Sequence, residues 1–313
     1  MARSIYRQYE SFAHGVNFLS FFFILRHNRS SKNAPTLLPF DFMKNFALIF
    51  LLFCLIPSKS RATTFFTEGA RRQFNQQAYN DLDMSSIRAG ILHNGDGFGI
   101  WGEVERFFPD NYNTATNSEI SALKNLGPFN LLLGFGHSDD FHFKPSHLYL
   151  AEIQVPTSIG LTPYFGASKE DYEAPIVNKF VYYKVGAVKT LSDGFSLLFQ
   201  YQFIDNQNTN RTINKIGSQL ASSLTYSNLN QLMQIGAQFS CTGNSASCDK
   251  SKSRDEYFES NFIYRWWVDS QIKTFGLRGQ VTYVYQKSFF IRETSSEIGR
   301  SSWTFRLGPQ FEF

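Results

Sequence analysis

Several features that mark soluble enzymes or helical membrane proteins are missing from this sequence. It holds three cysteines in 313 residues, and no paired-cysteine zinc motif, glycine-rich phosphate loop or hydrolase nucleophile elbow occurs. Long apolar runs end at residue 57, although aromatic residues make up 17% of the chain. So many aromatic residues without long apolar runs favour amphipathic strands. The absent motifs exclude a soluble enzyme.

A strong charge of one sign is also absent once the N-terminal leader is set aside. The whole chain carries 30 Lys+Arg and 26 Asp+Glu, of which residues 1–62 hold eight and two. Residues 63–313 keep 22 basic and 24 acidic residues, a formal charge near −2. Because no basic field remains, we expect no nucleic-acid polymer as a partner.

The N-terminal region has the pattern of a secretory leader preceded by an extension. Lys44 follows Met43, an apolar stretch covers 46–57, and Ser60-Arg61-Ala62 forms a small-x-small cleavage site. The apolar stretch is shorter than the roughly 18–20 residues of a helical span, which argues against an uncleaved anchor. We expect a cleaved signal peptide at 43–62, with 1–42 as a mis-assigned or non-structural extension.

Apolar and polar residues alternate without a break in the C-terminal segment 302–313. One face of such a strand is apolar and the other is polar or small. Similar alternation recurs about every ten residues, the length of a strand that crosses a membrane in a barrel. The pattern predicts an all-β fold, an antiparallel up-and-down transmembrane β-barrel of about 12 strands, within a range of roughly 10–14. The apolar positions are Trp303, Phe305, Leu307, Pro309, Phe311 and Phe313.

The barrel is expected over 86–313, after a periplasmic segment at 63–85. The eighth strand rests partly on parity, because a barrel with both termini in the periplasm needs an even number of strands. The expected strands are 86–94, 97–108, 128–137, 146–155, 159–168, 179–190, 194–205, 213–226, 231–240, 257–268, 272–287 and 302–313.

Counting back from the C-terminus assigns each connection to one side of the membrane. Most short turns fall on the periplasmic side and most longer polar stretches fall outside, as barrels of this class require. Asp193-Gly194 supplies typical turn chemistry. Two connections break the rule, since 109–127 becomes a long periplasmic connection and 94–97 a tight outer turn.

Charged residues of both signs fall on the inward face. They could line a water-filled lumen and tune its selectivity, or they could pair across the lumen and close it. Barrels of eight strands are filled by side chains and those of 16–18 are open, so about twelve strands leaves both possibilities. The predicted lumen-lining residues are Arg88, Glu103, Glu105, Glu152, Lys184, Glu259, Arg265, Arg278, Arg306 and Glu312.

Some aromatic residues also fall at inward positions. They could form a ladder on which a sugar or base stacks. Most aromatic residues of a membrane barrel instead form belts at the membrane interfaces. The inward candidates are Trp101, Phe107, Tyr164 and Trp267.

Histidines near the outer rim raise the alternatives of an enzyme and a metal site. His137 and Ser138 could serve an outer-membrane acyl hydrolase or acyltransferase, but adjacent strand residues point to opposite faces. Metal ligands spaced by five residues suit neither one helix face nor one strand face. We favour a solvated loop and expect no catalytic residue, metal or cofactor. The metal candidates are His137, Asp139, Asp140, His142 and His147.

Two cysteines remain after the leader. Cys241 and Cys248 lie seven residues apart in a polar stretch, so a disulfide that staples an outer loop is plausible in an oxidising compartment. A metal site is the weaker alternative, because no histidine or third cysteine is near.

The C-terminal strand resembles the signature by which the outer-membrane assembly machinery recognises bacterial barrels. The residues that carry it are Phe305, Leu307, Phe311 and Phe313. A second likeness runs through Leu126-Gly127-Pro128-Phe129, Leu148-Tyr149-Leu150 with Val155-Pro156, and 195–205. The order of these segments is similar to that of the nucleoside-specific outer-membrane channels, whose members are twelve-stranded. Trp101-Gly102-Glu103 stands where that family has Trp-Gly-Asp.

Three functions remain open on the sequence alone. The first is a passive outer-membrane channel for small hydrophilic solutes, with nucleosides implied by the resemblance. The second is a structural or adhesive barrel with a closed lumen, and the third is a lipid-modifying enzyme. The expected partners are outer-membrane lipid, the barrel assembly machinery and a small hydrophilic solute.

Overall fold

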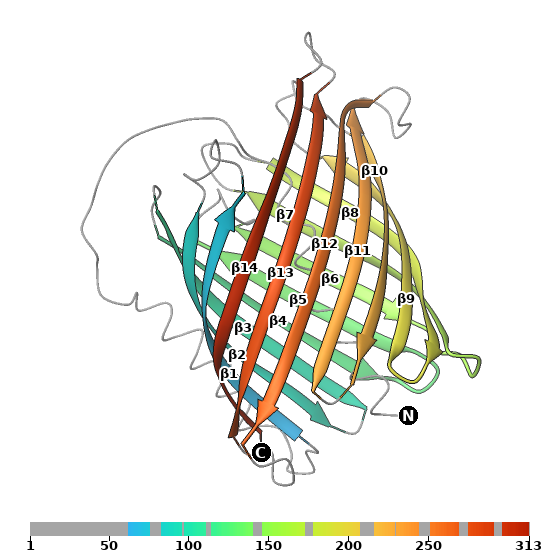
Figure 1. Cartoon of the computed structure of the whole chain (residues 1–313). Helices are drawn as coiled ribbons and strands as arrows, with labels where there is room; N and C mark the ends of the chain where they lie inside the picture. The colour runs from blue at the N-terminus through green and yellow to red at the C-terminus, as the bar shows by residue number, and fades with distance from the viewer. Residues whose placement is uncertain are drawn as a thin grey trace.

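The chain folds as a closed antiparallel β-barrel in a computed structural model. The structure describes residues 62–75, 83–95, 97–110, 114–139, 146–172, 178–206, 216–228, 230–243, 251–268, 275–290 and 296–312. Within these ranges fourteen strands form, steeply tilted against the barrel axis (Figure 1). They are β1 (Ala62–Phe74), β2 (Met84–Gly95), β3 (Phe98–Pro109), β4 (Ala115–Asn125), β5 (Asn130–Ser138), β6 (His147–Gln154), β7 (Leu161–Tyr172), β8 (Asn178–Ser192), β9 (Phe195–Asn206), β10 (Ile216–Ser227), β11 (Gln231–Gly243), β12 (Ser251–Trp267), β13 (Phe275–Phe290) and β14 (Ser296–Glu312).

The barrel closes where its first and last strands pair. Each strand pairs antiparallel with its neighbours in the chain, and β1 pairs with β14 from Thr64↔Glu312 to Phe74↔Ser302. Every one of the fourteen described strands therefore has two hydrogen-bonded neighbours. A sheet closed in this way satisfies its backbone without a free edge, which is the condition for β-structure in lipid.

The barrel is apolar on its outer face and largely polar on its inner face, the reverse of a soluble protein. Alternate residues point to opposite faces of a strand, and here the exposed side chains are largely apolar whereas many buried ones are charged or carry amides. The exposed apolar residues include Ile87, Leu133, Phe165, Val185, Phe199, Leu220, Trp266 and Leu307. The buried polar residues include Glu68, Arg88, Glu105, Glu152, Lys184, Gln202, Gln238, Arg278 and Gln310.

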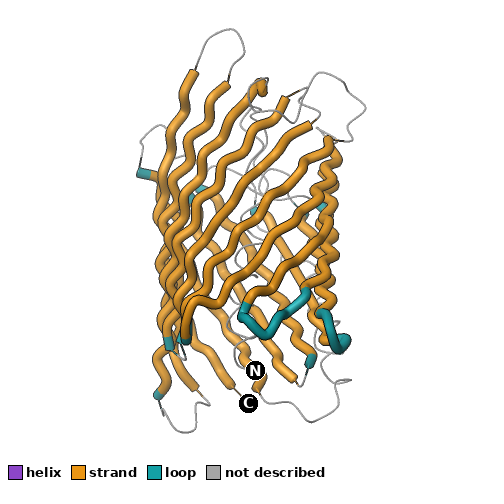
Figure 2. The backbone as a smooth tube through the Cα atoms, turned by 90° about the vertical axis from the view of Figure 1, so that its right-hand side faces the viewer, coloured by secondary structure: helices purple, strands orange, loops and turns teal. Residues whose placement is uncertain are grey.

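Short connections gather at one end of the barrel, which we name the turn end (Figure 2). They join each even-numbered strand to the next odd-numbered one, and the start of β1 and the end of β14 lie at the same end. Gly97, Gly127, Gly160 and Gly194 in these turns have φ between 72° and 89°, a conformation that disfavours other residues. The opposite end is named the loop end.

The expected all-β antiparallel barrel is confirmed, with fourteen strands rather than twelve. Segment 63–85, expected to precede the barrel, supplies β1 and the start of β2. The expected long connection 109–127 contains β4. Adding β4 reverses the directions expected for the first two strands, so the tight turn at 94–97 lies at the turn end with the other short turns. The two connections that broke the expected rule thereby conform to it.

The expected extension 1–42 and nearly all of the expected signal peptide 43–62 lie outside the described residues. Ala62, the last residue of that peptide, opens β1 and pairs with Asn94. The parts of the chain that the structure describes contain no helix long and apolar enough to cross a membrane.

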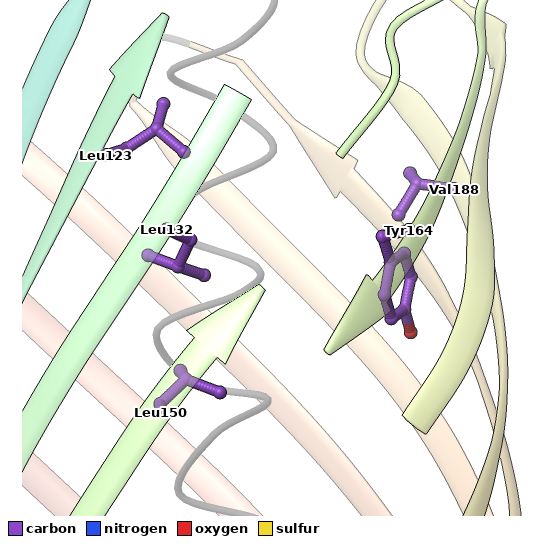
Figure 3. Packing of buried hydrophobic residues seen from close by; sticks show 5 residues of the cluster. All are labelled: Leu123, Leu132, Leu150, Tyr164 and Val188. Carbon is purple, nitrogen blue, oxygen red and sulfur yellow. The ribbon is translucent and has the colours of Figure 1, made fainter. Parts of the chain in front are cut away.

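A patch of apolar side chains lies on the inner face toward the turn end. Leu123, Leu132, Leu150, Tyr164 and Val188 come from five successive strands, β4 to β8 (Figure 3). Trp101 and Leu198 pack against them from β3 and β9. Part of the inner wall is therefore apolar, and the polar residues are concentrated elsewhere.

Candidate functional site

A network of buried charges crosses the seam where β1 meets β14. Glu68 on β1 accepts a hydrogen bond from Arg88 on β2, with 2.5 Å between Oε2 and Nη2. Its other oxygen lies 3.2 Å from Arg278 Nη1 on β13. Arg88 also lies 3.3 Å from Glu103 on β3. Opposite charges thus bridge from β13 across the seam to β3.

A second part of this network lies nearer the loop end. Arg306 on β14 donates to Glu105 on β3 at 2.5 Å, and Ser86 donates to the same carboxylate oxygen at 2.6 Å. Gln280 accepts from Arg88 at 3.1 Å and donates to Asn261 on β12 at 3.0 Å. The polar inner wall therefore extends without interruption from β12 to β3.

The same wall is hollowed in its loop-end half by a cavity of about 150 Å³. Arg72 on β1 donates to the Ser302 hydroxyl at 3.3 Å and lies 4.8 Å from the centre of the Phe74 ring. Arg300 on β14 donates to Gln286 at 2.9 and 2.6 Å. The remaining lining combines charged, hydroxyl and apolar side chains, including Met84, Ser86, Arg88, Glu103, Glu105, Phe107, Tyr257, Glu259, Asn261, Thr282, Val284, Thr304 and Arg306.

Across the barrel, a separate ion pair joins β8 to β6 over the strand between them. Lys184 Nζ lies 2.9 Å from Glu152 Oε2, and Gly166 on β7 is in register with both residues. A Cβ at position 166 would lie 3.0 Å from Lys184 Cε and 3.1 Å from Glu152 Cβ. Glycine leaves the room that the lysine needs to reach its partner.

The inner wall of β9 to β11 carries amides rather than charges. Gln200 donates to Gln202 at 3.2 Å and accepts from the Tyr164 hydroxyl at 2.9 Å. Other inward residues here are Gln219, Gln234, Gln238 and Ser240. The lumen therefore has a charged sector, an amide sector and an apolar patch.

The structure brings most of the predicted lumen residues into this charged sector. Arg88, Glu103, Glu105, Arg278 and Arg306 join the seam network, and Glu259 lines the cavity. Glu152 and Lys184 pair on the other wall. Arg265 is buried near the turn end of β12, and Glu312 is half-buried at the turn end of β14.

The four inward aromatic candidates do not form one ladder. Trp101 and Tyr164 belong to the apolar patch, and Trp267 is buried at the turn end of β12. Phe107 alone of the four lines the loop-end cavity. A ligand stacked on the Phe107 ring would therefore not contact Trp101, Tyr164 or Trp267.

The rim residues considered for catalysis and metal binding do not form a site among the members that the structure describes. His137 Nδ1 donates a hydrogen bond to the Ser146 carbonyl oxygen at 2.8 Å, because a carbonyl can only accept. Ser138 is buried on the inner face, whereas His137 follows the outward parity of Phe135. Among the described residues, no group of three or more His, Cys, Asp or Glu could hold a metal ion. His142 and Asp140 lie outside the described residues.

Other predicted residues lie on the outer face of the barrel. Phe305, Leu307 and Phe311 are exposed, and the rings of Phe311 and Phe275 lie 5.2 Å apart. Phe313 lies outside the described residues. Cys241 is disulfide-bonded, and its expected partner Cys248 also lies outside the described residues.

Sequence reasoning missed three charged residues of the polar wall. Glu68 and Arg72 fall in the segment expected before the barrel, and Arg300 falls in an expected outer loop. The outward neighbours on β1, Thr67, Gly69 and Arg71, are not apolar, so no alternation marks that strand. Arg300 was missed because β14 begins at Ser296, earlier than the expected strand 302–313.

Comparisons with known proteins identify no family and only distant structural likenesses. No family model and no curated protein matches the sequence. Similar solved structures include OmpT, an outer membrane protein of Vibrio cholerae in its trimer form, at 11% identity and TM-score 0.44, with 82% of this chain and 100% of that chain covered. An anion-selective porin from Comamonas acidovorans is 10% identical at TM-score 0.41, covering 81% and 100%. The outer membrane protein opdK from Pseudomonas aeruginosa is 8% identical at TM-score 0.42, covering 80% and 99%. Likeness of this degree carries no argument about function.

Proposed function

We propose that the protein is an outer-membrane channel through which small hydrophilic solutes pass passively. The observation that carries the proposal is the charged and amide-bearing inner face of a closed barrel whose outer face is apolar. Residues inside porin-like barrels face water and set selectivity, whereas the outer band faces lipid. Fourteen strands stand nearer to the 16–18 of open porins than to the eight of filled barrels.

In this proposal the turn end faces the periplasm and the loop end faces the exterior. Barrels of this class place short turns inside and longer loops outside. The signal peptide at 43–62 and recognition by the assembly machinery through Phe305, Leu307, Phe311 and Phe313 belong to the same proposal. Nucleosides remain the solute implied by the family resemblance, and no described contact assigns them a site.

Planar-bilayer recordings with the refolded full chain test the channel. We expect discrete conductance steps, and we expect swelling of proteoliposomes in a small neutral sugar. Uridine in the bath should reduce the current if nucleosides are preferred. Silence from protein that is folded by circular dichroism and by heat-modifiable migration would rule out the channel.

A second candidate, a structural barrel with a closed lumen, is favoured by one observation. Part of the inner wall is apolar, and Leu132 in it is completely buried. Nearby charged side chains are paired with each other, as in the Lys184–Glu152 ion pair. A water-filled passage does not require such a patch. Folded protein that neither conducts nor swells vesicles would support this candidate over the channel.

A further inference from the structure

The geometry points to a binding site for an uncharged sugar on the inner wall of β9 to β12. Five amide side chains there each leave one polar atom without a hydrogen-bond partner, and these atoms would bind the hydroxyl groups and ring oxygen of the sugar. We name these side chains the amide cluster: Gln202, Gln219, Gln234, Gln238 and Asn261. The assignment rests on the proposed function and deepens it by naming a class of solute.

The unpaired atoms of the amide cluster are buried, and most of them are donors. The five side chains are at most 4% exposed. The atoms without a partner are the nitrogens of Gln202, Gln219, Gln238 and Asn261 and the side-chain oxygen of Gln234. Native proteins pair nearly all buried polar side-chain atoms, because an unpaired one carries the full cost of its lost hydration. Five such atoms on four adjacent strands indicate that a partner from outside the chain completes them.

Neighbouring hydrogen bonds fix which end of Asn261 is unpaired. Arg88 has only donors, so it bonds to Gln280 through the oxygen Oε1, at 3.1 Å. Gln280 Nε2 then donates to Asn261 Oδ1 at 3.0 Å, and the Thr282 hydroxyl donates to the same oxygen at 3.1 Å. Asn261 therefore has its nitrogen left as a donor for a ligand.

A second chain of hydrogen bonds orients Gln202. The Tyr164 hydroxyl donates to Gln200 Oε1 at 2.9 Å, and Gln200 Nε2 donates to Gln202 Oε1 at 3.2 Å. The oxygen end of Gln202 is thus held by the wall, and its nitrogen is the end that can bind a ligand. An amide that is already held loses less side-chain entropy when a ligand binds.

The unpaired atoms lie close enough for one ligand to meet several of them. Gln202 and Gln219 are directly paired on β9 and β10, which places their Cβ atoms about 4.5–5.5 Å apart. Gln238 on β11 is the diagonal neighbour of Gln219, at about 7–8 Å. Gln234 and Asn261 are directly paired on β11 and β12, nearer the turn end. A sugar ring carries hydroxyl groups around its whole edge and can contact neighbouring members of this set at once.

Small inward residues leave room beside the amide cluster. Ala221 on β10 pairs with Gln238, and Ser223 on β10 pairs with Gly236 on β11. Asn261 lines the loop-end cavity. A solute in that cavity therefore reaches the cluster at Asn261, and the long glutamine side chains can turn toward it over the small residues.

The chemistry of the amide cluster selects an uncharged ligand. In the described parts of β9, β10 and β11 no inward residue is charged. An anion would lack a counter-charge there and would meet the carboxylate of Glu259, which is in register with Gly236. A cation would meet four donor groups and a single acceptor. A hydroxyl oxygen has two acceptor lone pairs and one donor, so a sugar offers the excess of acceptors that the cluster requires.

The test compares D-glucose with two relatives of the same ring size. D-glucuronate carries a carboxylate in place of the hydroxymethyl group, and 2-(hydroxymethyl)tetrahydropyran lacks the ring hydroxyls. Binding to the folded full chain in detergent micelles is measured by ligand-observed NMR titration. We expect D-glucose to bind at least about fivefold more tightly than either relative. No binding of D-glucose, or equal binding of all three, would overturn the site.

Gln219→Leu separates ligand binding from a structural role. Leucine removes an unpaired buried amide, so the free energy of unfolding should stay equal or rise, whereas D-glucose binding should weaken by about threefold to tenfold. Gln310→Leu is the matched control, because Gln310 is also buried and unpaired but lies on β14 near the turn end, outside the cluster. This control should leave D-glucose binding unchanged. Equal losses of binding in the two variants, or no loss in Gln219→Leu, would contradict the site.

Uridine tests the competing class of ligand in the same titration. We expect D-glucose to bind at least as tightly as uridine. Uridine binding that is tighter than D-glucose binding and is lost in Gln219→Leu would assign the amide cluster to nucleosides and overturn the sugar site.

The site and the channel can fail separately. D-glucose binding in micelles without conductance in bilayers would reject the proposed channel and retain the site. Conductance without D-glucose binding would reject the site and retain the channel. Folding of every variant is checked by circular dichroism, so that a loss of binding is read only from folded protein.

Discussion

Among single residues, Glu68 has the most consequential environment in the barrel wall. Its side chain is fully buried, and its oxygens lie close to Arg88 and Arg278. Removing one member of a buried ion pair leaves charge without compensation, which costs about 3–5 kcal/mol. We therefore predict that Glu68→Gln lowers the free energy of unfolding by about 3 kcal/mol, measured by denaturant titration in lipid vesicles.

The matched control for this prediction is Glu256→Gln. Glu256 is exposed on the outer face of β12 near the loop end, where loss of one charge should change stability by less than about 0.5 kcal/mol. Equal unfolding midpoints for the two variants would show that the seam network adds nothing to stability.

Residue parity explains which site residues were predictable. A strand's inward and outward faces alternate whatever its direction, so Arg88, Glu105 and Glu152 were assigned to the inner face although the first strand directions were wrong. Glu68 could not be assigned, because Thr67 and Gly69 beside it give no apolar face. The pairing of Glu68 with Arg278 depends on barrel closure, which brings together residues about 200 positions apart and leaves no local trace.

At the scale of strands, β4 shows why alternation failed locally. Its outward positions include Thr116, Ser118 and Lys124, and its inward positions include Leu123, so polarity does not separate the two faces. A strand whose two faces both mix polar and apolar side chains shows no alternation that separates it from a polar connection. The strands from β5 onward were predicted, with their ends placed to within six residues; the largest differences are the starts of β12 and β14.

The closing strand pair depends on a glycine. A Cβ at Gly308 would overlap the Thr67 carbonyl oxygen and lie 2.7 Å from Glu68 Cα. Because both obstacles are backbone, β1 and β14 would have to move apart. We predict that Gly308→Ala costs about 1–3 kcal/mol and lowers the fraction of heat-modifiable folded barrel.

The control for this seam prediction is Gly69→Ala. Gly69 pairs with Leu307 across the same seam, and a Cβ there would meet nothing within 4 Å. This variant should assemble like the parent chain. Similar folded fractions for the two alanine variants would mean that the seam tolerates the closer approach.

The two faces of β10 give a second test at this scale. Leu220 is exposed on the outer face at mid-strand, and Ala221 is the next residue on the inner face. An arginine on the lipid face near the bilayer midplane costs about 2–4 kcal/mol. Leu220→Arg should therefore lose that much stability in vesicles, and Ala221→Arg should lose much less. The reverse order would place the outer face in water.

For the whole molecule, strand number and the placement of turns are linked. Two strands, β1 and β4, were not recognised in the sequence. Because two is an even number, the end of the barrel at which each turn lies was still predicted correctly from β5 onward. Local patterns could not supply the closure of β1 on β14, because it pairs the two ends of the barrel. The requirement for an even number of strands therefore gave the correct end of the barrel for each later turn, but it did not give the total number of strands.

The balance of charge inside the barrel predicts weak ion selectivity if the lumen conducts. Opposite charges held within a few ångströms largely cancel beyond the Debye length, about 10 Å at 0.1 M salt. The zero-current potential in a tenfold KCl gradient should therefore lie close to zero. The described inward charges are Arg72, Arg88, Lys184, Arg265, Arg278, Arg300 and Arg306 against Glu68, Glu103, Glu105, Glu119, Glu152, Glu170, Glu259 and Glu312.

Reversing two charges on the loop-end wall should break this balance. Arg72→Glu with Arg300→Glu converts two positive groups near the cavity into negative ones. The field along the lumen then favours cations, so the zero-current potential should shift in the cation-selective direction. Arg71→Glu, on the outer face of β1, should leave it unchanged, since that side chain does not face the passage. A parent channel that is already strongly selective, or a double variant that does not shift, would contradict a passage along the wall from β12 to β3.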